Sequence, residues 1–233
     1  MTETRELPMF RELITNADGS TEEGTCSEDH ALSLLRRAVR LGFQVEATRH
    51  GGAVIVREIP GSTGTHRHTV ALEPVTPAGR LTATVRLDLA IIDRRMGRSL
   101  AARLNPVTGR IDAGLNSIPP AAAARLISRG LVTVTDGAVA VSLTARLAML
   151  AQDHRTETRQ PRGWYQRSSV DGQPLPGPSW VRARYASYDR SSVASCSCHG
   201  WSYPAEDRDD ARRRAHGHRQ EVTARFVAAL AAA

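Results

Sequence analysis

Two cysteines and three histidines lie close together near the C-terminal end of the chain, and no other stretch concentrates as much metal-binding chemistry. Residues 195–219 hold two of the three cysteines and three of the eight histidines. Cys196 and Cys198 flank one residue in a run, Ser192–Trp201, that we predict to be a strand. Side chains alternate along a strand, so both sulfurs would lie on one face. Thiolates and imidazoles are ligands that zinc favours.

A helix is predicted over residues 207–229, after an acidic turn. His218 lies three residues after Ala215 and four before Val222, which places it on the inward face of this helix. His216 is two residues away, and an unbroken helix would turn it by about 200° from His218. We therefore predict a structural zinc site whose ligands are Cys196, Cys198, His218 and, as the fourth, His216 or His199.

A strand pair carrying two cysteines, followed by a helix carrying histidine, resembles a ββα zinc finger over about residues 180–230. The resemblance implies a zinc-binding ββα module at 179–233 that folds around Zn²⁺. The other interpretation is a pair of reduced core thiols with histidines on the surface.

Charge is distributed unevenly along the chain, whose net charge is +7. The first 30 residues carry 8 acidic residues and 2 arginines, whereas the remaining chain has 29 arginines against 16 acidic residues. We predict an acidic, disordered tail at 1–25, with at most a short helix near Met9–Ile14. A basic body suits a polyanion such as nucleic acid, although a solvated arginine surface would have the same composition.

All 31 basic residues are arginine, and alanine is abundant. This usage indicates a GC-rich genome, such as that of an actinobacterium. Three cysteines, two of them one residue apart, do not form a disulfide framework, so a reducing compartment is expected. With no signal peptide and no apolar run of about 18 residues, we expect a cytoplasmic protein that does not contact membranes.

Residues 26–76 are predicted to form a helix capped by Ser27 and then three strands. Leu41-Gly42-Phe43, followed by Arg49-His50-Gly51-Gly52, resembles the HicA family of mRNA-cleaving toxins, which fold like a double-stranded-RNA-binding domain. That family has a catalytic histidine in a Gly-Ser-His triplet, where this chain has Gly51-Gly52-Ala53. A non-catalytic α+β domain is therefore expected.

Residues 77–154 are predicted to contain helices at Leu81–Met96, Ser99–Leu104 and from Asn116-Ser-Ile-Pro-Pro onward, a tight hairpin at Asp136-Gly137, and a final helix. The string from Ala124 to Val132, a short wing and Val141-Ser-Leu-Thr resemble the end of a MarR-like winged helix-turn-helix domain. The resemblance implies that the helix before the wing contacts DNA. Winged helices also serve as dimerisation or docking modules.

Residues 155–178 are predicted to be a linker, and the aromatic residues that follow mark a change of composition. Alternating tryptophan and arginine side chains can stack on bases and contact phosphates, or else form the core of a small module. The residues predicted to contact nucleic acid are Arg110, Asn116, Arg125 and Arg129 in the middle domain and Trp180, Arg182 and Arg184 in the C-terminal module.

Taken together, these patterns predict an α+β chain of three small modules. We expect a nucleic-acid-binding accessory or regulatory protein, most simply DNA-binding, of an actinobacterium or one of its mobile elements. No catalytic constellation is present in the sequence, so an enzyme is not expected. A non-catalytic adaptor that docks a protein partner or a second copy is the first alternative, and a degenerate HicA-like ribonuclease using His50 is the second.

Overall fold

The computed structural model of the chain describes residues 9–61, 64–93, 101–159, 164–166, 180–182 and 192–232. Helices and antiparallel sheets alternate along the chain, so the α+β class is confirmed. The chain divides into two compact units, a main unit of Met1–Asp153 with Gln220–Ala233 and a small unit of His154–Arg219. Within the described residues, no helix has the length and apolar character needed to cross a membrane.

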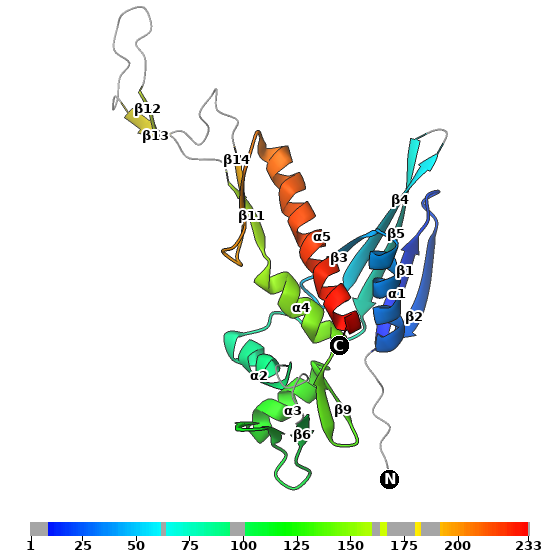
Figure 1. Cartoon of the computed structure of the whole chain (residues 1–233), viewed down its shortest axis with the longest axis vertical. Helices are drawn as coiled ribbons and strands as arrows, with labels where there is room; N and C mark the ends of the chain where they lie inside the picture. Colours follow the sequence, from blue (N-terminus) through cyan, green and yellow to red (C-terminus); the bar gives the residue numbers. More distant parts are fainter. Residues whose placement is uncertain are drawn as a thin grey trace, which may run out of the picture. The chain divides into compact units, whose positions relative to one another are not determined.

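The first sheet of the main unit has the order β2-β1-β5-β4-β3 (Figure 1). Its strands are β1 Met9–Thr15, β2 Thr21–Ser27, β3 Gln44–Ala47, β4 Ala53–Gly61 and β5 Gly64–Pro74. Helix α1, Glu28–Arg40, packs on one face and buries Ala31, Leu35 and Ala38 against that sheet. As predicted, Ser27 caps α1, since its hydroxyl accepts a hydrogen bond from the His30 backbone N–H at 3.3 Å.

The N-terminal segment is not the predicted disordered tail or short helix, at least from residue 9 onward. Residues 9–27 form the β1–β2 hairpin, and β1 pairs along its length with β5. Phe10 is completely buried in the core beneath α1, which explains why the segment is ordered despite its acidic composition. Residues 1–8 lie outside the described residues.

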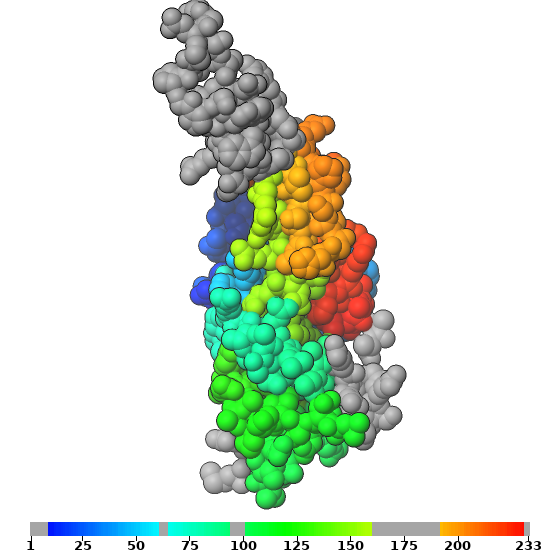
Figure 2. Space-filling model, turned by 90° about the vertical axis from the view of Figure 1, so that its left-hand side faces the viewer, coloured from blue at the N-terminus to red at the C-terminus, as the bar shows by residue number. Residues whose placement is uncertain are grey.

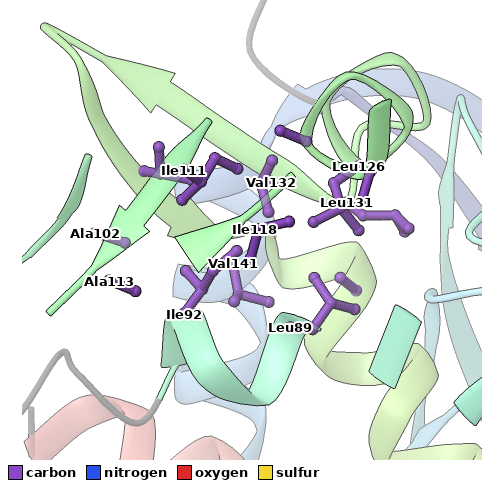
Figure 3. Close-up of a cluster of buried hydrophobic side chains, with 14 of the residues drawn as sticks. Leu89, Ile92, Ala102, Ile111, Ala113, Ile118, Leu126, Leu131, Val132 and Val141 are labelled. Carbon is purple, nitrogen blue, oxygen red and sulfur yellow. The ribbon is translucent and has the colours of Figure 1, made fainter. Parts of the chain in front are cut away.

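The second sheet of the main unit has the order β8-β7-β6-β10-β9. Its strands are β6 Ala102–Leu104, β7 Ile111–Ala113, β8 Asn116–Ile118, β9 Val132–Thr135 and β10 Ala138–Val141, and its helices are α2 Ala83–Asp93, α3 Pro120–Ser128 and α4 Leu143–Asp153. Figure 3 shows Leu89 and Ile92 of α2 meeting Ile118, Leu126 and Val141 in its core.

This region agrees with the prediction for α2, α3, the β9–β10 hairpin and α4, but it departs from it before α3. The helix predicted at Ser99–Leu104 is wrong for residues 102–104, which form β6, and residues 99–100 lie outside the described residues. Strands β6, β7 and β8 precede α3, and Asn116–Ile118, which was predicted to open a helix, forms β8. They are each three residues long, and periodicity over so short a run does not distinguish strand from loop.

Helix α4 contributes side chains to both cores of the main unit. The last part of α5, a helix that spans Arg208–Ala232, packs in the first core. Leu143 and Leu147 of α4 enter the core of the first sheet, whereas Ala145 and Ala148 enter the core of the second. Val227 of α5 is fully buried in the first core. The Ala47 backbone N–H on the edge strand β3 donates to the Thr223 hydroxyl at 3.1 Å, so α5 satisfies a polar group that the sheet leaves unpaired.

Two strands lie where the sequence predicted a linker. In the small unit, β11 Thr156–Arg159 pairs with β14 Ser192–Cys196, which pairs in turn with β15 Ser202–Ala205. A separate ribbon joins β12 Trp164–Gln166 to β13 Trp180–Arg182. The segment lacks strong alternation, and its strands form through pairing with residues that are distant in the sequence.

A turn at Gly51 packs directly against the start of α4. Gly51 has φ +90°, and a Cβ built there would lie 2.3 Å from the Thr144 carbonyl oxygen. Gly42 has a similar φ of +74° but open space around it. We expect Gly42→Ala to cost about 1–2 kcal/mol from the left-handed backbone alone. We expect Gly51→Ala to cost an additional ~1–3 kcal/mol from overpacking.

Urea denaturation of both variants checks this expectation. Equal losses would show that the turn at Gly51 can move away from α4.

Glu28 links the two cores, since one oxygen of its carboxylate accepts a hydrogen bond from the Leu143 backbone N–H at the start of α4. Burial raises the pKa of Glu28 above its ordinary value of 4.5, while the Leu143 hydrogen bond acts in the opposite direction. The folded state therefore holds this proton more tightly than the unfolded state, and Glu28 stabilises less as pH rises from the ordinary pKa through the raised one. Its second oxygen is buried without a hydrogen-bond partner.

Glu28→Gln keeps an acceptor for the Leu143 N–H and removes the buried charge. As pH rises from 4 to 7, we expect the free energy of unfolding of this variant to increase relative to that of the wild type. Glu28→Ala should be less stable than Glu28→Gln because the N–H loses its acceptor. Denaturant titrations at several pH values measure both effects, and parallel pH profiles for wild type and Glu28→Gln would contradict the first.

Candidate metal centre

Four metal-binding side chains converge in the small unit: His154, Cys196, Cys198 and His218. One ligand atom from each lies within 4.8 Å of the other three. His154 Nδ1 is 3.6 Å from Cys196 Sγ, and His218 Nε2 is 4.0 Å from Cys198 Sγ. These ligands come from the residue after α4, the end of β14, the turn that follows β14, and α5.

The spacing can accommodate a tetrahedrally coordinated metal ion. Zinc binds sulfur at about 2.3 Å and imidazole nitrogen at about 2.0–2.1 Å, so adjacent ligand atoms of a tetrahedron lie about 3.4–3.8 Å apart. The two sulfur–nitrogen distances are close to that range before any ion draws the ligands in. Two cysteines and two histidines form a common structural zinc set. The residues present thus fit the predicted zinc ion.

A tight turn, not strand alternation, brings the two sulfurs together. Strand β14 ends at Cys196, and Cys198 lies in the turn between β14 and β15. The Cys196 N–H donates to the Trp201 carbonyl at 3.0 Å, and the His199 N–H donates to the Cys196 carbonyl at 3.1 Å. His199 has φ +57°, the left-handed conformation that reverses the chain here. The predicted pairing of the cysteines is therefore reached by a different local structure.

Strand β11 positions His154. Arg155 and Ser197 are joined by two hydrogen bonds of 2.9 Å, from the Ser197 N–H to the Arg155 carbonyl and from the Arg155 N–H to the Ser197 hydroxyl. Thr156 is paired with Cys196 in the ladder. Together these contacts place His154 beside the cysteine turn. Figure 2 shows the yellow-green surface of β11 adjoining the orange surface of the cysteine turn and the start of α5.

Helix α5 contributes His218, which Trp201 holds in place. The two rings are stacked, with centroids 4.4 Å apart and planes 11° from parallel. The His154 ring is 5.6 Å from that of His218 and tilted by 57°. Arg219, the next residue on α5, donates a hydrogen bond to the Thr156 hydroxyl of β11. Such outer contacts orient ligands and fix the side of the ring that meets a metal.

Burial favours the neutral form of two ligands. It lowers the pKa of His154, which leaves the imidazole nitrogen free to bind a metal. It also raises the pKa of the Cys196 thiol, while a hydrogen bond from the Cys198 backbone acts in the opposite direction. A bound cation would reverse this effect on Cys196, since a coordinating thiol is deprotonated. The pocket is therefore unfavourable for a free thiolate and suited to a metal-bound one.

Neither His216 nor His199, the two residues predicted as the fourth ligand, belongs to the cluster. Helix α5 runs through Gly217 without a break, so His216 points to a different side from His218. Its Nδ1 lies 3.5 Å from an Arg219 guanidinium nitrogen. His154 takes the fourth position. The zinc-finger resemblance covers only about residues 180–230, which excludes His154. No local spacing in the sequence links His154 to Cys196.

The residues predicted to contact nucleic acid lie at separate places in the fold. Arg110 precedes β7 and is exposed, and its Nε donates to the Ser117 hydroxyl at 2.9 Å. Asn116 is exposed at the start of β8, and Arg125 is exposed on α3. Arg129 is half-buried and donates a hydrogen bond to the Ala78 carbonyl, so it has a structural contact.

The remaining predicted contacts involve the second ribbon. In the register of β12 and β13, Trp180 lies opposite Gln166 and Arg182 opposite Trp164. Arg184 lies outside the described residues.

No protein-family model matches the sequence, and neither a curated protein nor a solved structure matches the chain.

We expect the purified chain to carry about one equivalent of zinc, held by four side chains. His154→Ala should abolish stoichiometric binding. His216→Ala is the matched control on α5 and should retain the ion, as should His199→Ala. Elemental analysis of protein prepared without chelators or acid measures all three. Retention of zinc by His154→Ala together with its loss in His216→Ala would restore the ligand set predicted from sequence.

Proposed function

We propose that this chain is a non-catalytic nucleic-acid-binding protein, of accessory or regulatory type, whose small unit folds around a structural zinc ion. The observation that carries the proposal is the four-residue cluster of His154, Cys196, Cys198 and His218. Of these, His218 lies on α5, whose first turns bear exposed arginines. Four protein ligands complete a zinc tetrahedron and leave no open position for a substrate. This arrangement favours a structural metal over a catalytic one.

The apolar core of the small unit supports the same conclusion. Trp201 and Tyr203 are partly buried against a cluster of four buried alanines. These are Ala194, Ala205, Ala211 and Ala215. Alanine removes little apolar surface from water, and small domains bury too little to be stable without a metal or disulfides. The three cysteines of the chain are free. Metal binding would therefore supply folding free energy to this unit.

Arginines surround the first turns of α5. Ala211 and Ala215 face the core, and Arg212, Arg213 and Arg214 between them spread over the remaining circumference, since successive residues turn by about 100°. The side chains of Arg212, Arg213 and Arg214 are 57%, 71% and 52% exposed. Arg214 also lies over the Tyr203 ring, 4.5 Å from its centroid.

Acidic residues in the first turn of α5 form ion pairs with these arginines, and the guanidinium groups can still contact phosphates. Arg212 contacts Asp209 at 3.0 Å, and Arg213 and Arg214 each approach Asp210 at 3.5 Å. The Arg212–Asp209 pair is exposed on both sides and contributes little, so a phosphate can replace this carboxylate. Asp210 is only 15% exposed, but its two arginines are themselves exposed and can reach a phosphate. Phosphate contacts of this type hold a protein on nucleic acid and give little sequence preference.

We expect the triple variant Arg212→Ala, Arg213→Ala, Arg214→Ala to bind duplex DNA at least about tenfold more weakly. The slope of log affinity against log salt concentration should fall by the equivalent of up to about three phosphate contacts. Arg225→Ala is the matched control: it lies on the same helix, is exposed, and forms an i,i+4 ion pair with Glu221. Its affinity should remain within about twofold. Fluorescence anisotropy over a salt series, on zinc-loaded protein, measures both.

Unchanged DNA binding in the triple variant would remove the arginine face from the interface. Absence of DNA binding in the wild type would favour the adaptor, in which the zinc unit docks a protein.

A further inference from the structure

Strands β4 and β5 continue well beyond the sheet that contains them. Strand β3 pairs with β4 only over Ala53–Val56. On the other side, β1 pairs with β5 only over Thr69–Pro74. Arg57–Gly61 and Gly64–His68 therefore pair only with each other. This two-stranded arm is about 16 Å long. Figure 1 shows it in cyan, projecting past the ends of the neighbouring strands.

Packing within the fold does not account for the arm. Ile55 and Val70 belong to the core beneath α1, but among the described residues no member of the arm does. Ile59 and His68 are half-buried, whereas the other described side chains of the arm are exposed: Arg57, Glu58, Pro60, Thr65, His66 and Arg67. A two-stranded ribbon without a covered face is marginally stable in water. Because the arm adds little to the core, we infer that it contacts a partner.

The register divides the arm into two chemically different faces. Arg57 is paired with His68 and Ile59 with His66, and these four side chains lie on one face. The other face has Glu58 opposite Arg67 and Pro60 opposite Thr65. The first face thus presents three nitrogen-bearing side chains and one apolar side chain, and the Asp18 carboxylate of the β1–β2 turn interacts electrostatically with His68. On the second face, a carboxylate directly opposes a guanidinium.

We propose that this arm enters the major groove of B-form DNA with the face formed by Arg57, Ile59, His66 and His68 toward the bases. The proposal rests on the proposed function and names the surface that reads the duplex. The major groove, about 12 Å wide, admits a two-stranded ribbon. The major groove of A-form RNA is too deep and narrow for side chains to read. B-form DNA is therefore the occupant whose shape and charge fit this arm.

Each side chain has a defined contact in this arrangement. Arg57 can reach a phosphate or a guanine edge, and its guanidinium already lies over the Phe43 ring, 5.3 Å from the centroid, at the base of the arm. The two imidazoles supply donors for acceptors on base edges or phosphates. Ile59 supplies an apolar surface for thymine methyl groups.

The test compares two double variants of the full-length, zinc-loaded chain. His66→Ala with His68→Ala alters the reading face, and Glu58→Ala with Arg67→Ala alters the opposite face at constant net charge. We expect the first pair to weaken binding to a labelled DNA duplex about tenfold and the second to change it by less than about twofold. Equal effects of the two pairs, or none from either, would overturn the proposal.

Chemical probing identifies the groove. Dimethyl sulfate methylates guanine N7 in the major groove, and bound wild-type protein should protect N7 where the His66/His68 variant does not. Equal competition by an RNA duplex of the same sequence, or protection confined to the minor groove, would also overturn the inference. Wild-type binding that is lost only in the α5 arginine triple variant would sustain the proposed function while rejecting the arm. Thermal denaturation of each variant should match the wild type, because the arm lies outside the core.

Discussion

Among its described residues, the small unit buries few apolar side chains, and its stability depends on this constraint. A cluster of four alanines removes far less surface from water than the leucine, isoleucine and phenylalanine cores of the main unit. The four residues of the cluster lie in the same unit, next to β11, at the end of β14, in the turn after β14 and on α5. An ion at this point would fix the three segments that the alanines hold only weakly. The stacking of Trp201 on His218 couples the largest partly buried side chain of that core directly to a ligand.

The tryptophans make this dependence measurable without separating the units. All three, Trp164, Trp180 and Trp201, belong to the small unit, and the main unit has none. Tryptophan fluorescence therefore reports the small unit, while far-ultraviolet circular dichroism is dominated by the helices and sheets of the main unit. The large apolar cores of the main unit contain no ligand of the cluster, so its stability should be independent of the metal.

Sequence reasoning identified the elements with local signals and missed those made by distant pairing. The start of α1 was predictable because Ser27 caps the helix, and the β9–β10 hairpin was predictable from Asp136-Gly137. Strand β1 was missed because its apolar residues come in two pairs, Met9-Phe10 and Leu13-Ile14, a spacing that fits a helix better than the alternation of a strand. Its pairing with β5 and the burial of Phe10 make it a strand. The same holds for β11, which forms by pairing with β14 across more than thirty intervening residues in the sequence.

The metal ligands show the same division between local and distant information. Ligand chemistry was sufficient to select Cys196, Cys198 and His218, although the turn that joins the cysteines was taken for a strand. His154 could not be found by spacing, because the β11–β14 ladder alone brings it to the cysteines. An exposed fourth histidine close in sequence, such as His199, is a plausible ligand until this ladder is known. A metal ion held by all four side chains would have no open position for a substrate. It would act instead by holding surfaces in place, and the start of α5, with its exposed arginines, is one such surface.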